Sequence, residues 1–340
     1  MRVLLVKLSS MGDVLHNLPV VSDLARAYPD IEIDWVTEAP YAKLVALHPK
    51  VQRVIPIHLR ELKQRWWSPA AWSTISADRA QLKGSVYDTI LDTQGLIKSA
   101  LVCRAAVGPI TGFSPDSARE PVAALGYDRH LSVPRNLHAV ERNRRLAAGI
   151  FGYRLGPCVD YGLQLPKTTP NDVLITPYIV FLHATSRSDK RWPELSWIAL
   201  GHRLHERGLG VVLPWGDDNE RRTSERLASA IPGARVPAKL SLVEAATLLS
   251  QAQGVIGVDT GLAHLSVALA RPTVGLYLTT SPALTGLYGS DLALNNYAGD
   301  VGVTGGSNRA INLGGGSPHR PVVPSVADAW DALLSQLPPI

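Results

Sequence analysis

Short β-branched runs of hydrophobic residues alternate along this chain with longer segments whose apolar positions follow a helical period. The runs cover residues 2–6, 33–36, 53–57 and 87–92 in the first half, and 178–182, 210–213, 255–258 and 273–277 in the second. The intervening segments are long enough for helices, as over 197–207. This alternation predicts α/β architecture with mostly parallel sheets covered on both faces.

A polar, proline-rich stretch divides the pattern near residue 170. At 340 residues the chain is long for one core and sufficient for two domains. We expect an N-terminal domain over 1–166, a linker over 167–177, a second domain over 178–323 and a C-terminal helix within 324–340. The glycine-rich stretch 298–317 lacks hydrophobic periodicity, which predicts a loop or a partly disordered segment.

Composition narrows the functional classes. A net charge of +5 favours an anionic partner without choosing among nucleic acid, a membrane surface and a phosphorylated substrate. Two cysteines make no disulfide framework, and neither a signal peptide nor a long apolar run is present. We expect a cytosolic protein with at most peripheral membrane contact.

Polar loops follow several predicted strands, where open α/β sheets bind ligands. The segment 254–277 reads as strand, loop, helix and strand, and the helix start around Thr260 and Gly261 suits a phosphate. An ordinary β-α-β unit is the alternative. The loop 183–193 carries hydroxyls and the basic residues Arg187, Lys190 and Arg191, a set suited to a diphosphate, although solvated basic loops are common.

Two carboxylates are candidates for specific roles. Asp13 follows the first strand and could act as a general base, yet the sequence alone favours a helix cap. Glu220 could accept hydrogen bonds from ribose hydroxyls. Asp217 and Asp218 are adjacent and need not converge, so we expect no catalytic metal. The dinucleotide, P-loop and hydrolase motifs are absent from the sequence.

Basic residues of the first half are candidates for binding an anionic acceptor. Arg60 and Lys63 stand next to tryptophans, a combination that suits a membrane interface, a large anionic acceptor or single-stranded nucleic acid. A solvated amphipathic helix explains them equally well. The further candidates, which could instead form structural ion pairs, are Lys98, Arg119, His138 and Arg142.

Seven segments together resemble the ADP-heptose:lipopolysaccharide heptosyltransferases. They are KLSSMGDVLHNLP at 7–19, DTQGLIKSA at 92–100, SAREP at 117–121, HAVERNR at 138–144, HATSRSDKRWP at 183–193, LPWG at 213–216 and VDTGLAHL at 258–265. The resemblance is nearest to members that add the first heptose to the Kdo region of the inner core.

The resemblance implies a GT-B fold, with two Rossmann-like domains facing a central cleft, and an inverting transfer that needs no metal or other cofactor. It implies Asp13 as the base. It implies donor contacts from Thr185, Ser186, Lys190, Glu220, Asp259, Thr260, Gly261, Leu262 and His264. It implies acceptor contacts from Arg60, Lys63, Lys98, Arg119, His138 and Arg142.

The implied partners are ADP-heptose, Kdo2-lipid A and, peripherally, the cytoplasmic face of the inner membrane, with no nucleic acid. A relative that adds a later heptose is one alternative. A sugar-nucleotide-binding protein without turnover is another. The loop 278–282 departs from the family pattern, so the resemblance assigns no contacts to it.

Overall fold

The computed structural model describes residues 1–60, 67–166, 177–185, 187–289, 304–305 and 310–337. The chain forms two compact units. Unit 1 comprises Met1–Gly156 and Asp160–Gln164, and unit 2 comprises Pro157–Val159 and Leu165–Ile340. Except for Pro177, the predicted linker lies outside the described residues.

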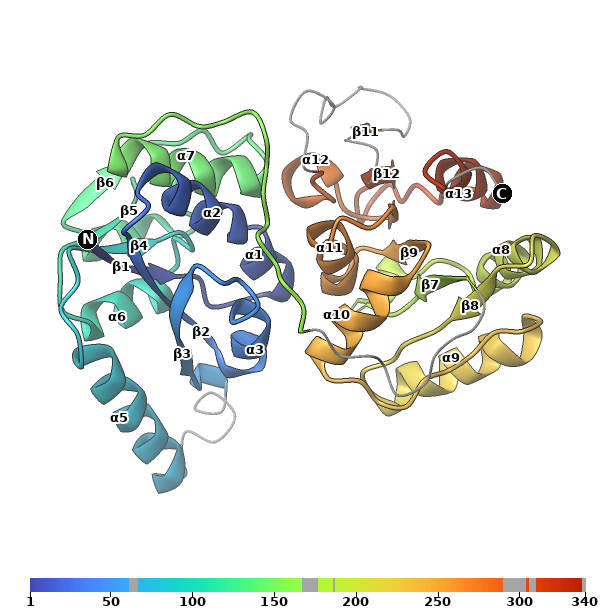
Figure 1. The fold of residues 1–340 in the computed structure, drawn as a ribbon, viewed down its shortest axis with the longest axis horizontal. Helices are drawn as coiled ribbons and strands as arrows, with labels where there is room; N and C mark the ends of the chain where they lie inside the picture. Colours follow the sequence, from blue (N-terminus) through green and yellow to red (C-terminus); the bar gives the residue numbers. More distant parts are fainter. Residues whose placement is uncertain (61–66, 167–176, 186, 290–303, 306–309, 338–340) are drawn as a thin grey trace. The chain divides into compact units, whose positions relative to one another are not determined.

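Unit 1 contains a six-stranded parallel sheet in the order β3-β2-β1-β4-β5-β6 (Figure 1). The strands are β1 (Arg2–Val6), β2 (Glu32–Glu38), β3 (Val51–Ile57), β4 (Thr89–Asp92), β5 (Ile110–Phe113) and β6 (Arg129–Leu131). This is the order of a Rossmann-type sheet, which reverses between β1 and β4. The loops that follow these two strands therefore lie at the switch point where such sheets bind ligands.

The helices of unit 1 pack on this sheet. They are α1 (Met11–Leu15), α2 (Leu18–Ala27), η1 (Ala39–Tyr41), α3 (Ala42–Val45), α5 (Pro69–Lys83), α6 (Ile97–Ala105), η2 (Pro121–Gly126) and α7 (Ala139–Phe151). Pro19 sits in the first turn of α2, where its missing N–H costs no helical hydrogen bond. The chain therefore begins a new helix at this proline instead of continuing α1.

Unit 2 is built on a second six-stranded sheet in the order β11-β12-β10-β9-β7-β8. Its strands are β7 (Tyr178–Leu182), β8 (Gly210–Val212), β9 (Gly254–Val258), β10 (Thr273–Tyr277), β11 (Thr304–Gly305) and β12 (Ala310–Gly314). All pairs are parallel except β11 with β12. The order reverses between β7 and β9, so their following loops again share a switch point.

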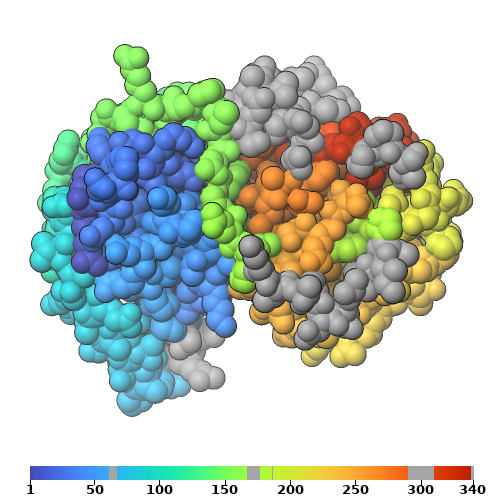
Figure 2. Space-filling view, in the orientation of Figure 1, coloured from blue at the N-terminus to red at the C-terminus, as the bar shows by residue number. Residues whose placement is uncertain are grey.

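The helices of unit 2 are η3 (Ser188–Lys190), α8 (Glu194–Glu206), α9 (Asp218–Ala230), α10 (Leu242–Gln251), α11 (Gly261–Ala268), α12 (Pro282–Thr285) and α13 (Val326–Leu334). The C-terminal helix α13, red in Figure 2, packs against α8 and strands of the second sheet. It buries Ala329 and Leu333 in the core of unit 2, which explains its apolar stripe.

The glycine-rich stretch differs from the prediction where the structure describes it. Residues 310–314 are not a loop but the strand β12, which pairs with β10. Ala310 and Leu313 are buried, and the buried Asn312 side chain exchanges hydrogen bonds with the backbone of Leu287. This long-range pairing stabilises a strand that has no hydrophobic period of its own. Residues 298–303 and 306–309 lie outside the described residues.

Over the described ranges, no helix combines the length and the apolarity that crossing a bilayer requires.

Candidate functional site

Loops from three neighbouring strands of unit 2 meet at the Asp259 carboxylate. Asp259 follows β9, the strand between β7 and β10. Lys190, in the loop after β7, places its Nζ 2.6 Å from Asp259 Oδ2. Thr280, in the loop after β10, donates from Oγ1 to the same oxygen at 3.0 Å. The sheet order therefore brings together residues that are far apart in the sequence.

The Asp259 carboxyl is held ionised. Burial by itself raises its pKa, but hydrogen bonds and positive charge from His264 and Lys190 outweigh burial and hold the pKa well below its usual range. His264 Nε2 lies 3.9 Å from Asp259 Oδ1. The carboxylate thus fixes the Lys190 ammonium, and His264 supports the loop from within α11.

The N-terminus of α11 lies beside this ion pair. Thr260 is the N-cap residue and its side chain makes no capping hydrogen bond, while Gly261 and Leu262 open the helix with half-buried positions. Thr185 Oγ1 donates to the backbone oxygen of Asp259 at 3.2 Å. Backbone N–H groups at a helix start stabilise an anion, so the predicted diphosphate residues Thr185, Lys190 and Thr260 are adjacent here. Ser186 lies outside the described residues.

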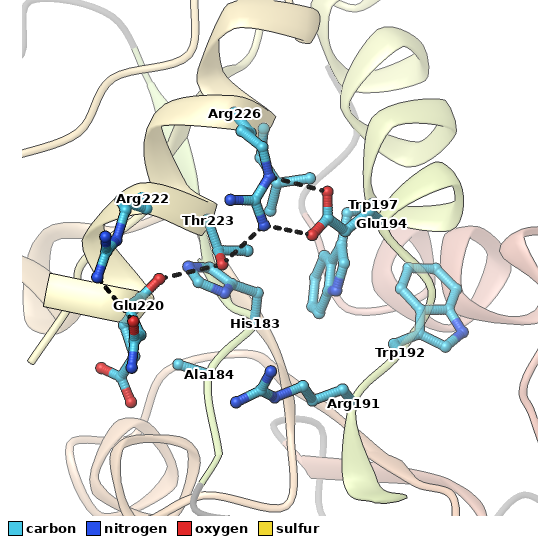
Figure 3. A pocket seen from close by; sticks show the side chains of 12 residues that line it. His183, Ala184, Arg191, Trp192, Glu194, Trp197, Glu220, Arg222, Thr223 and Arg226 are labelled. Carbon is cyan, nitrogen blue, oxygen red and sulfur yellow. Dashed lines mark hydrogen bonds and ion pairs between the residues drawn. The ribbon is translucent and has the colours of Figure 1, made fainter. Parts of the chain in front are cut away.

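A cavity of about 360 Å³ lies between α8, α9 and the end of β7 (Figure 3). Glu220 lines it, and its Oε2 accepts a hydrogen bond from the backbone N–H of Gly216 at 2.7 Å. In the wall of the cavity, Arg226 donates hydrogen bonds to Glu194 and to Thr223. Its other lining residues are His183, Ala184, Arg191, Trp192, Trp197, Asn219, Arg222 and Leu227. Glu220 is thus fixed at the rim of a polar cavity.

In unit 1 the loops after β1 and β4 are tied together by Gln94. Its Oε1 accepts from the backbone N–H of Leu8 at 2.6 Å, and its Nε2 donates to the backbone oxygen of Ser9 at 2.6 Å. Lys98 Nζ donates to Ser9 Oγ at 2.8 Å. These bonds place Lys98, at the start of α6, next to the loop that leads into Asp13.

Asp13 is the third residue of α1, not its N-cap residue. Its Oδ2 accepts from Ser10 N at 2.9 Å and from Ser10 Oγ at 3.0 Å. The carboxylate satisfies a backbone donor at the helix start and remains half-buried. A capping contribution and an accessible carboxylate therefore coexist at this residue.

The other basic candidates of unit 1 fall into two groups. Burial lowers the pKa of Lys7. The charges of Arg119 and Arg142 lower this pKa further, whereas the charge of Asp13 raises it. Arg60 and Lys98 act on the buried Glu38, whose pKa is raised by burial and lowered in part by these cations. The loops at the carboxyl edge of this sheet thus collect positive charge from separate segments.

Three of these side chains contact a neighbouring residue of unit 1. Arg142 donates to the backbone oxygen of Ser117 and lies over the Phe113 ring. His138 is the N-cap of α7, where its Nδ1 accepts from Val140 N at 3.2 Å. Arg60 donates to Tyr41 Oη at 3.0 Å, and Arg119 is exposed. Lys63 lies outside the described residues.

Four residues of these sites escaped the sequence reasoning. They are Lys7, Glu38, Gln94 and Thr280. Each lies within a few residues of a strand end, so a scan of every strand terminus for polar residues would have found them. Within the described part of the chain, no three His, Cys, Asp or Glu side chains form a group that could hold a metal ion.

The sequence of this chain is similar to those of known proteins. Residues 76–299 match the model of glycosyltransferase family 9 (heptosyltransferase). The chain is 45% identical over 294 residues to lipopolysaccharide heptosyltransferase 1 of Pseudomonas aeruginosa, covering 85% of this chain and 82% of that protein.

Two solved structures are similar at the level of the fold and of the sequence. The E. coli heptosyltransferase WaaC with ADP superposes with a TM-score of 0.80 and 41% identity, covering 85% of this chain and 91% of that one. The same enzyme with ADP-2-deoxy-2-fluoro heptose gives 0.77 and 41%, covering 83% and 90%. The fold is thus the predicted GT-B type, and the chain belongs to glycosyltransferase family 9, the heptosyltransferases.

Proposed function

We propose that this glycosyltransferase moves heptose from ADP-heptose to a Kdo hydroxyl of Kdo2-lipid A, with inversion and without a metal ion. The observation that carries the proposal is the Lys190–Asp259 pair beside the N-terminus of α11. It offers a fixed cation and the backbone donors of a helix start for a diphosphate. Similarity to an enzyme solved with ADP and with a fluorinated ADP-heptose supports the donor.

The donor would be held by unit 2. Lys190 would pair with the diphosphate oxygens and neutralise the charge that grows as ADP leaves. Thr185, Ser186 and the first N–H groups of α11 would donate to the same oxygens. Glu220 would accept from ribose hydroxyls at the rim of its cavity. Asp259 and His264 would orient the heptose and keep Lys190 in position.

The acceptor would be bound by unit 1. Arg60, Lys63, Lys98, Arg119, His138 and Arg142 would contact its phosphates and carboxylates, because guanidinium and ammonium groups bind such anions strongly. The clustering of cations around Lys7 and Glu38 supports this assignment. We place the protein at the cytoplasmic face of the inner membrane, where a lipid acceptor is accessible.

The transfer is a single displacement. The acceptor oxygen forms a bond to the anomeric carbon while the bond from that carbon to the diphosphate oxygen breaks and ADP leaves. Asp13 takes the hydroxyl proton, a role that its half-buried carboxylate permits. Attack opposite the leaving group inverts the anomeric centre.

An acceptor comparison tests this proposal. The purified protein is incubated with ADP-heptose and either Kdo2-lipid A or the same lipid already carrying one heptose, and the products are weighed by mass spectrometry. We expect product from Kdo2-lipid A. Product only from the heptosylated lipid would indicate an enzyme that adds a later heptose. Donor binding by calorimetry without product from either lipid would indicate a non-catalytic binding protein.

A further inference from the structure

Four large apolar side chains are exposed on two adjoining elements of unit 1. Ile97 and Leu101 of α6 are 45% and 67% exposed, and Val122 and Leu125 of η2 are 60% and 79% exposed. Residues four apart in an α-helix share a face, as do residues three apart in a 3-10 helix. Each pair therefore points to one side of its element. We call these four residues the α6–η2 patch.

The two elements that carry the patch pack against each other. α6 and η2 are in contact. A Cβ placed on Gly126 would lie 3.2 Å from the Ala100 Cβ, and the backbone N–H of Ile97 donates to Glu120 Oε2 at 2.7 Å. In Figure 2 the surface of residues near 100, coloured cyan to teal, lies at the left edge of the view.

Other residues of these two elements, and not the patch residues, face the core of unit 1. α6 buries Ala100, Val102 and Cys103 in the core of unit 1, and η2 buries Ala123 and Ala124. Burial in the core therefore does not explain the four outward residues. Single exposed apolar residues are ordinary, whereas a contiguous group marks an interaction surface.

Basic residues lie on or just before the same two elements. Lys98 and Arg104 lie on α6, and the exposed Arg119 lies two residues before η2. The nearest acid on these elements is Glu120, whose carboxylate accepts the Ile97 N–H. Apolar side chains flanked by lysine and arginine match an anionic phospholipid surface, which takes the apolar groups among its acyl chains and attracts the cations.

We infer that the α6–η2 patch docks unit 1 on an anionic lipid bilayer. This inference rests on the proposed function, because Lys98 and Arg119 are also proposed contacts of a lipid acceptor. Docking at the patch would bring these two residues to the surface in which that acceptor is embedded. The anchor would thus continue directly into the acceptor-binding loops.

Sedimentation with vesicles of phosphatidylethanolamine and phosphatidylglycerol tests the inference. The variant L101Q/L125Q removes two apolar contacts without touching a proposed acceptor or donor residue. We expect its vesicle partition coefficient to fall at least about tenfold. Leu195, which is 80% exposed on α8 of unit 2, provides the matched control, and L195Q should bind vesicles as the wild type does. Thermal unfolding checks that both variants fold.

The possible results distinguish a failure of the docking inference from a failure of the proposed function. L101Q/L125Q should convert a deacylated, water-soluble acceptor at the wild-type rate and lose rate only on vesicle-embedded acceptor. Equal vesicle binding by the wild type and L101Q/L125Q would overturn the docking surface while leaving the proposed function intact. A wild-type dimer that L101Q/L125Q dissociates would also overturn it, in favour of a second copy. Failure of the wild type on both acceptors would contradict the proposed function instead.

Discussion

Lys190 and Asp259 form an ion pair of 2.6 Å in which each side chain is only 16% exposed. The two residues come from loops after adjacent parallel strands, β7 and β9, and Thr280 from the next strand over donates to the same carboxylate. The arrangement holds an ammonium group at the start of α11. A cation fixed in this way by its own ion pair stabilises a diphosphate without first having to be ordered.

Lys190→Ala should weaken binding of ADP-heptose. Loss of one charge-assisted contact to phosphate predicts roughly a 10- to 100-fold rise in the dissociation constant. Isothermal titration with ADP-heptose or ADP measures it. Lys83→Ala removes an equal charge from an exposed position of unit 1 and should leave the affinity unchanged. Equal affinity of Lys190→Ala and the wild type would remove Lys190 from the diphosphate site.

Asp13→Asn should abolish most of the transfer and spare donor binding. A general base contributes about 100- to 10,000-fold to a rate, so we expect kcat to fall within that range. The amide oxygen can still accept from Ser10, which keeps the start of α1 capped. Asp30→Asn, at an exposed position, serves as the control. Unchanged turnover in Asp13→Asn would mean that Asp13 is not the base and only caps the start of α1.

Arg144 of α7 makes a buried pair with Asp23 of α2, and this pair should be critical for the stability of unit 1. Its Nε and Nη2 lie 2.6 and 3.1 Å from the two carboxylate oxygens. Arg144→Ala leaves a buried carboxylate poorly compensated and should lower the free energy of unfolding by about 3–5 kcal/mol. Urea unfolding measures this change.

Arg145→Ala is the matched control for that measurement, because Arg145 makes only a half-exposed pair with Glu141 one turn away. Exposed pairs of this kind contribute little to stability. A similar loss in both variants would mean that burial of the Arg144 pair is not what matters.

The stability of unit 1 should decline in mild acid because of His48. Burial lowers the pKa of His48 from 6.5 to about 4. As the pH falls below 6.5, the unfolded chain binds a proton that the folded chain excludes until about pH 4. The neutral His48 imidazole therefore contributes to the free energy of unfolding above pH 6.5. This contribution is lost as the pH falls towards 4, by at most roughly 3 kcal/mol.

His48→Gln should flatten this part of the pH profile, measured as urea unfolding between pH 4 and 7. The glutamine can still hydrogen-bond to Ser22, the present partner of His48 Nε2 at 3.0 Å. His205→Gln, at an exposed position of unit 2, should leave the slope unchanged. An identical slope in the wild type and His48→Gln would contradict the assignment to His48.

The fold was predictable wherever a strand carries its own hydrophobic run. The run at 2–6 coincides with β1, and the run at 178–182 coincides with β7. Strands β5, β6, β11 and β12 were not predicted. The first three are short, with four, three and two residues, whereas β12 has five residues and depends on its neighbours. β12 is held by its register with β10 and by the Asn312 contacts to Leu287. Such pairing is a property of the sheet and leaves no local pattern.

The sequence predicted which loops form the candidate site, but it predicted only part of the contacts between their residues. Position after a strand identified the basic loop that holds Lys190, because parallel strands present their carboxyl ends at one edge. Asp259 was implied only by the resemblance to the heptosyltransferases. The distance between these two residues and the third partner Thr280 depend on the strand order, which the sequence pattern does not give. The role of Asp13 in the reaction stays a prediction.

The most direct test of the proposed reaction is heptose transfer in the absence of metal ions. The protein, freed of metal and held in EDTA, is incubated with ADP-heptose and Kdo2-lipid A, and the lipid is analysed by mass spectrometry. We expect a lipid heavier by one heptose and an equal amount of ADP, at a rate that added Mg²⁺ does not raise. A lipid of unchanged mass, or heptosylation only after a metal ion is restored, would contradict it.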